Sequence, residues 1–198
     1  MPRKTDAKDR MIRTSAELFR ARGFHGVGLA EILEESGAPK GSFYYHFPGG
    51  KDELAVDVIG SGGRFIGKLI DKAFENAGSV DDGVRSLVEL IATAFEESGF
   101  EMGCPVTSLI LDMTPSDDNI RRAGEAVLDH WKERMIENAR RILPPEADPK
   151  DYENAFWSLL VAIEGGWVVS RMTHSKAPIL LACEIYQQAL AADGLTAR

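Results

Sequence analysis

The chain has 198 residues, of which 44% are hydrophobic and 27% charged, and its formal net charge is −8. This composition is ordinary for a soluble protein with a core. No apolar run approaches the roughly 20 residues that span a bilayer, and the N-terminus lacks a signal peptide's apolar stretch, so we expect a cytoplasmic protein. Cys104 and Cys183 are far apart and form no CxxC pair, which argues against a disulfide framework and a zinc site.

Helical periodicity runs along the chain and strand signals are almost absent, which predicts an all-α protein of nine helices. The first helix ends at Gly23, and two short helices follow at 29–36 and 40–46. The other six are expected from Lys51 to about Asn76, from Ser79 to about Ser98, from Val106 to a stop at Thr114-Pro115, from Ser116 to Pro144, from Asp148 to about Met172, and from Pro178 to Ala192.

The second and third helices are joined by Gly37-Ala38-Pro39, a three-residue turn with a glycine, as in a helix-turn-helix. In that motif the later helix lies in the major groove of DNA. Phe43 and Phe47 are four residues apart and anchor this helix inward. The outward positions carry polar side chains that can bond to phosphates and base edges, namely Lys40, Ser42, Tyr44 and His46.

The distribution of charge fits this interpretation. An acidic chain by itself argues against nucleic-acid binding. However, residues 1–54 hold nine Lys or Arg and eight Asp or Glu, so the negative charge lies in the rest of the chain. An acidic body repels phosphate and leaves the N-terminal head to face DNA. Lys51 can meet a phosphate at the start of its helix, beside free backbone N–H groups.

A dense set of residues between 9 and 54 matches one known family. The matching positions are Ile12, Ala16, Leu18-Phe19, Gly23-Phe24, Ile32, Gly37, Lys40 to Phe47, and Lys51 to Leu54. They resemble the DNA-binding domain of the tetracycline-repressor (TetR) family. The third-helix sequence, with Gly103-Cys104-Pro105 later, is similar to the LmrA/YxaF-like branch. The resemblance implies a nine-helix TetR-like fold, with residues 1–50 as the DNA-binding domain and residues 51–198 as the ligand-binding and dimerisation domain.

The resemblance also implies a function: a dimeric repressor of a palindromic operator, released from double-stranded DNA by a small-molecule inducer. Its third helix would be the recognition helix. The implied DNA contacts are Gly28, Lys40, Gly41, Ser42, Tyr44, Tyr45, His46 and Lys51. This chain departs from the family at Val27-Gly28, where a Thr or Ser pair usually opens the second helix. Glycine can cap a helix, but only its backbone N–H is left to meet a phosphate.

The helix expected at about 148–172 is apolar on more than one face between Ser158 and Ser170. Such a helix is buried on several sides, either within one subunit or against a second copy. Small residues let a partner helix approach closely, and the resemblance implies a four-helix dimer interface. The candidate interface residues are Ser158, Ala162, Gly165, Gly166, Ser170 and Ile185.

Large, adaptable side chains in the middle helices are either ordinary core or the lining of an inducer site. The resemblance favours an apolar or aromatic inducer, and the candidate lining residues are Phe65, Phe95, Met102, Met113, Trp131, Glu164 and Trp167. Glu164 is the lone charge between Ser158 and Val169, and a buried carboxylate needs a partner. That partner is either an Arg of the same dimer or a cationic group of the ligand.

The long helix from Lys51 contains Gly60, Gly62, Gly63 and Gly67. Each interior glycine costs a helix up to about 1 kcal/mol relative to alanine. No strand precedes them, so they are not a dinucleotide fingerprint. They form either a soft joint, through which ligand occupancy resets the spacing of the heads, or a close packing surface against the first helix.

Other classes of protein are less well supported. The chain has no HExxH, GxSxG or P-loop motif and no metal spacing among its histidines, so we expect no catalytic activity, cofactor or metal. Two alternatives stay open. One is a redox-sensing regulator that uses the Cys104 thiol, although such a cysteine is more often a small buried hydrophobe. The other is a helical interaction module that does not bind DNA.

Overall fold

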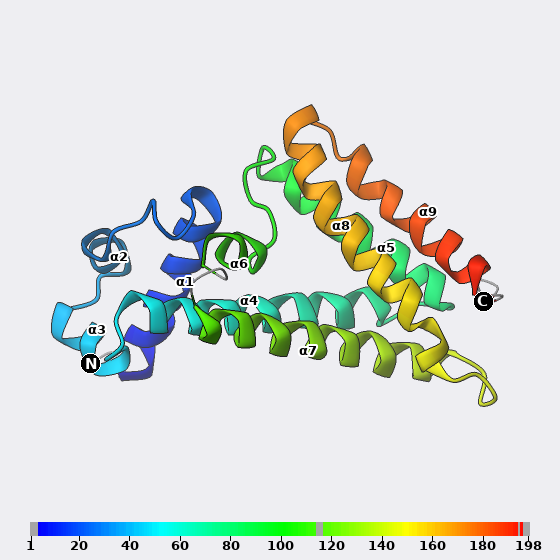
Figure 1. Ribbon diagram of the computed structural model, residues 1–198, viewed down its shortest axis with the longest axis horizontal. Helices are drawn as coiled ribbons and strands as arrows, with labels where there is room; N and C mark the ends of the chain where they lie inside the picture. The colour runs from blue at the N-terminus through cyan, green and yellow to red at the C-terminus, as the bar shows by residue number, and fades with distance from the viewer. Residues whose placement is uncertain (1–3, 114–116, 194, 196–198) are drawn as a thin grey trace. The chain divides into compact units, whose positions relative to one another are not determined.

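The structure is a computed structural model that describes residues 4–113, 117–193 and 195. Nine α-helices and one 3-10 helix, with no strand, account for the regular structure of these residues (Figure 1). The elements are α1 (Lys4–Arg22), α2 (Leu29–Ser36), α3 (Lys40–His46), α4 (Lys51–Phe74), α5 (Val80–Glu97), α6 (Thr107–Met113), α7 (Asp118–Ile142), η1 (Pro149–Tyr152), α8 (Glu153–Thr173) and α9 (Ala177–Ala192). The all-α prediction is confirmed. The predicted break at Thr114-Pro115 and the start at Ser116 lie outside the described residues.

Local signals at helix ends act as the sequence predicts. The Ser79 hydroxyl accepts the N–H of Asp82 at 3.1 Å and caps α5. Gly23 follows α1 with φ +72° and Gly37 follows α2 with φ +61°, both in the left-handed region that favours glycine. The expected helix start at Asp148 is a 3-10 turn that leads into α8.

The chain divides into two compact units, each built from two separate stretches. The first contains Met1–Arg64 and Cys104–Val127, and the second contains Phe65–Gly103 and Leu128–Arg198. α4 and α7 therefore each contribute to both units, and α6 belongs to the first. The boundary predicted at residue 50 separates a DNA-binding domain from a ligand-binding and dimerisation domain. Compact units do not test such a functional division, so it stays a prediction.

Aromatic side chains from α1 and from the region of α3 form part of the core of the first unit. Phe19, Phe43 and Phe47 are buried, and the rings of Phe43 and Phe47 lie 5.3 Å apart. This confirms that Phe43 of α3 and Phe47, which directly follows the helix, both anchor inward. α6 also lies against α1 in this unit.

In the second unit, α8 packs along α9, and α9 also packs against α5. A close approach of α8 to α9 occurs at Gly166, where an added Cβ would lie 2.9 Å from the Cα of Ile179. The rings of Phe156 and Tyr186 stack 6.2 Å apart and join the same two helices. No described helix is long and apolar enough to cross a membrane.

Close packing accounts for three of the four glycines of α4. An added Cβ would lie 3.1 Å from the Cβ of Pro105 at Gly62, 2.5 Å from Cγ2 of Val127 at Gly63, and 2.5 Å from Nε2 of His130 at Gly67. The packing interpretation is therefore supported, but the neighbours found here are α7 and the residues before α6. Packing of these glycines against the first helix stays a prediction, although α1 does meet α4 through the ion pair of Lys8 with Asp57 at 2.7 Å.

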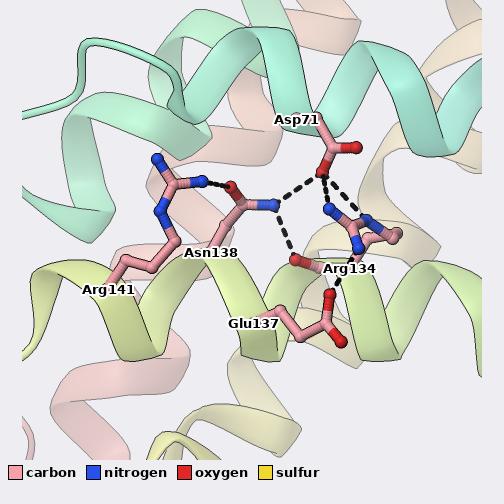
Figure 2. Close-up of polar contacts among 5 residues, drawn as sticks. All are labelled: Asp71, Arg134, Glu137, Asn138 and Arg141. Atoms are coloured by element: carbon pink, nitrogen blue, oxygen red, sulfur yellow. Dashed lines mark hydrogen bonds and ion pairs between the residues drawn. The ribbon is translucent and has the colours of Figure 1, made fainter.

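A polar cluster joins α4 to α7 in the second unit (Figure 2). Oδ1 of Asp71 accepts hydrogen bonds from Nε and Nη2 of Arg134, at 2.9 and 2.6 Å, and from Nδ2 of Asn138 at 2.8 Å. Burial alone would raise the pKa of Asp71, but the hydrogen bonds from Arg134 and Asn138 outweigh it and hold the pKa below its ordinary value. Asp71 is therefore a charged, well-bonded link between the two helices.

Candidate nucleic-acid interface

The turn between α2 and α3 depends on Gly37. Its N–H donates to the carbonyl of Glu34 at 3.2 Å, and the next N–H, of Ala38, donates to Leu33 at 3.1 Å. These bonds satisfy carbonyls at the end of α2 while the left-handed φ redirects the chain. Pro39 then precedes α3 with an extended backbone. This is the three-residue connection that the sequence predicts for a helix-turn-helix.

α3 presents its polar and aromatic side chains on the surface. Lys40 and Gly41 are exposed, Ser42 and His46 are half-buried, and Tyr44 and Tyr45 are 48% and 68% exposed. The Tyr44 ring packs edge-on against buried Phe43, with centroids 5.2 Å apart, and the Tyr45 ring packs edge-on against His46 at 5.0 Å. Both tyrosines thus pack against neighbouring rings, and about half of the Tyr44 surface and two thirds of the Tyr45 surface are exposed.

Lys51 has an internal role that the sequence does not reveal. Its Nζ donates to the carbonyl oxygens of Phe24 and Val27, at 2.9 and 2.8 Å, and lies 3.9 Å from the centroid of the Phe24 ring. Burial lowers the pKa of the Lys51 ammonium. An ammonium has three N–H donors, so at most one remains for a phosphate. The contact of Lys51 with a DNA phosphate stays a prediction, and it would use this remaining donor.

Gly28 caps α2 through its backbone. Its carbonyl accepts the N–H of Ile32 at 3.2 Å, and no side chain contributes to the cap. An added Cβ at Gly28 would meet nothing within 4 Å. The surface here is open to close approach by another molecule, but a backbone contact to phosphate stays a prediction.

An exposed apolar face runs along α8 and α9. It contains Trp157, Val161, Val168 and Met172 on α8 and Leu181 and Ile185 on α9. Met172 is 78% exposed, and Gly165, on the same face, has nothing within 4 Å of an added Cβ. Exposed apolar side chains that gather on one helix pair are typical of interaction sites on soluble proteins. We call these residues and Gly165 the α8/α9 face.

The predicted interface residues divide between this face and the interior of the chain. Ile185 and Gly165 are exposed, and Ser158 and Ala162 are half-buried. Gly166 packs against Ile179, and Ser170 is fully buried. Because both are covered within the subunit, we leave Gly166 and Ser170 out of any interface between copies. The pattern of small residues in the sequence could not show which of the two glycines, Gly165 or Gly166, is covered by α9.

The candidate ligand-binding residues differ in burial and do not all belong to one compact unit. Phe95, Met113 and Trp131 are buried, Met102, Glu164 and Trp167 are half-buried, and Phe65 is exposed. Met113 belongs to the first unit and the other six to the second. The buried indole N–H of Trp167 has no hydrogen-bond partner among the described residues. The Cys104 thiol, proposed above as an alternative sensor, is only 5% exposed.

Comparisons with known proteins agree with this geometry. Residues 81–185 match the family model for the C-terminal domain of LmrA/YxaF-like transcriptional regulators, and residues 11–58 match that of the tetR family of bacterial regulatory proteins. The chain is 28% identical to two Bacillus subtilis (strain 168) proteins. One is the uncharacterized HTH-type transcriptional regulator YxaF, over 93% of this chain and 95% of that protein, and the other is LmrA, over 88% and 92%.

Solved structures show the same fold. The regulatory protein TetR from Rhodobacter sphaeroides matches with a TM-score of 0.74 and 25% identity, over 92% of this chain and 98% of that one. The reduced form of E. coli NemR matches with a TM-score of 0.75 and 21% identity, over 92% and 96%. With the family models and the helix-turn-helix described above, these matches show that the chain is a helix-turn-helix transcriptional regulator of the TetR family, in its LmrA/YxaF-like branch.

Proposed function

We propose that this protein is a ligand-responsive repressor that binds a palindromic operator as a homodimer through α3, in the cytoplasm. The observation that carries the proposal is the exposed set on α3, with Tyr44 and Tyr45 held open above a buried Phe43-Phe47 anchor. Lys, Ser, Tyr and His side chains offer the donors and acceptors needed for base edges and phosphates. This exposed set also argues against an interaction module that has lost DNA binding.

The α8/α9 face supports the homodimer. A single helix-turn-helix contacts few base pairs, and dimers of such proteins place their recognition helices roughly 34–36 Å apart. In a two-fold dimer each copy supplies the same surface, so the apolar side chains of this face would cover one another. A palindromic operator then follows from the symmetry of the protein.

The proposal of an inducer is supported by the large apolar side chains of the second unit and by the buried N–H of Trp167, which has no partner in the described part of the chain. Together they suit an apolar or aromatic molecule that carries a hydrogen-bond acceptor. Release from DNA is the expected response, and E. coli NemR, a relative, is named as a repressor. A thiol-based sensor is less favoured, because the buried Cys104 is poorly accessible to oxidants.

DNA capture tests the proposed function. Purified protein is mixed with genomic fragments that include the region upstream of its own gene, and bound fragments are sequenced and then titrated at two salt concentrations. We expect one enriched palindrome with half-sites about one helical turn apart, bound more weakly as salt rises. Binding of all fragments with the same affinity as random DNA would contradict a sequence-specific repressor.

A further inference from the structure

Phe24, in the turn between α1 and α2, is held by two other helices of the first unit. From α6, Oδ2 of Asp112 accepts the Phe24 N–H at 2.7 Å. From α4, Lys51 donates to the Phe24 carbonyl at 2.9 Å and covers its ring. Both backbone polar groups of this buried residue are therefore bonded to side chains from outside the helix-turn-helix.

The turn is shaped to receive the Asp112 carboxylate. Gly23 adopts φ +72°, and an added Cβ at Gly23 would lie 2.6 Å from Oδ2 of Asp112. Any larger residue would both strain the backbone and displace the carboxylate. Gly23 thus has two reasons to be glycine, and the second depends on a residue 89 positions later in the chain.

The bonds that hold the Phe24 turn also fix the start of α2. Lys51 also bonds to the carbonyl of Val27, which is buried and directly precedes the N-cap residue Gly28. A turn fixed at Phe24 and Val27 fixes where α2 begins, and α2 leads through the Gly37 turn to α3. A loss of either side-chain link would leave the start of α2 free to vary.

We propose that Asp112 of α6 is a positioning residue of the DNA-binding head, which with Lys51 fixes the Phe24 turn and thereby the orientation of α2 and α3. This inference rests on the proposed function for its effect on DNA, but not for its effect on the turn. The sequence analysis placed α6 in the ligand-binding and dimerisation domain. Through Asp112, α6 would also help to orient the DNA-binding head.

Two variants of Asp112 and one control test the inference. Asp112→Ala removes the acceptor, whereas Asp112→Asn keeps a side-chain oxygen and loses only the charge. Glu125→Ala is the control, because it removes an exposed carboxylate of the same unit, which pairs with Arg121 on its own helix. Thermal unfolding confirms that each variant is folded.

Hydrogen exchange of peptides that contain Phe24 reports the turn directly. We expect exchange at least about tenfold faster in Asp112→Ala than in the wild type, because a buried N–H loses a charged acceptor, and near-normal exchange in Asp112→Asn and Glu125→Ala. Unchanged exchange in Asp112→Ala would overturn the proposed link between α6 and the turn.

Affinity for the captured palindrome is the second readout, and here the loss of charge and the loss of positioning predict opposite effects. Removing a carboxylate reduces repulsion of phosphate, so charge alone predicts tighter binding in both Asp112 variants. Positioning instead predicts binding weakened by about tenfold in Asp112→Ala, with rescue in Asp112→Asn. Equal or tighter binding in Asp112→Ala would overturn the positioning role. A wild-type protein with no sequence preference would overturn the proposed function, and the exchange result would still decide whether Asp112 fixes the turn.

Discussion

Replacing both Val161 and Val168 with Asp is expected to yield a monomer that binds the operator at least about 100-fold more weakly than the wild type. The two side chains are 69% and 61% exposed in the single chain and lie on the α8/α9 face. In a two-fold dimer each substitution occurs twice, so four carboxylates would enter an apolar interface. Ion burial without a partner is strongly unfavourable, and a monomer contacts only one half-site.

Multi-angle light scattering across a range of protein concentrations measures the mass, and a fluorescence titration measures operator affinity. Leu111→Asp is the control for the mass, because Leu111 is 71% exposed but lies on α6, outside the α8/α9 face. We expect Leu111→Asp to remain dimeric. A dimeric Val161→Asp, Val168→Asp double variant would show that this face is not the interface.

Gly63→Ala is expected to lower the free energy of unfolding by about 1–3 kcal/mol, as overpacked cores do. The added Cβ would lie 2.5 Å from Cγ2 and 3.0 Å from Cγ1 of Val127, which is buried. A β-branched side chain has few rotamers with which to escape, so the helices themselves must move apart. The clash outweighs the gain of about 1 kcal/mol that alanine brings to a helix interior.

Gly60→Ala is the matched control on the same helix. Among the described residues its added Cβ would approach the flexible end of Arg64, at 3.4 Å, so the substitution should raise the free energy of unfolding by up to about 1 kcal/mol. Urea unfolding of both variants at one fixed protein concentration measures the difference. Equal effects of the two substitutions would contradict the packing interpretation. If the two substitutions change the free energy of unfolding in opposite directions, as we expect, Gly63 is explained by packing, and of these two glycines only Gly60 could serve as a soft joint.

Much of the DNA-binding head could be predicted because its signals are local. A glycine three residues before Lys40 ends one helix, and the i, i+4 pair Phe43 and Phe47 decides which face of α3 points inward. Once that face is assigned, the exposure of Tyr44 and Tyr45 follows. The same locality explains why the cap at Ser79 was predicted correctly.

The parts that could not be predicted depend on contacts distant in sequence. Lys51 has the spacing of a phosphate-binding lysine, but its acceptors are carbonyls 24 and 27 residues earlier. Asp112 bonds to Phe24 across 88 residues, and no local pattern marks either partner. In α8, periodicity shows that several faces are apolar, but packing against α9 decides that Gly166 is covered and Gly165 is not.

DNA recognition by α3 is tested most directly by the operator affinity of a Lys40→Ala, Tyr44→Ala double variant. Both side chains are exposed, and the Tyr44 ring packs edge-on against Phe43, so the variant should fold and dimerise normally. Glu17→Ala, exposed on α1, is the control on the head. Our account predicts that the double variant loses at least about 100-fold in affinity, with a shallower salt dependence, while Glu17→Ala binds as tightly as the wild type or more tightly. A folded, dimeric double variant that binds the operator as the wild type does would contradict it.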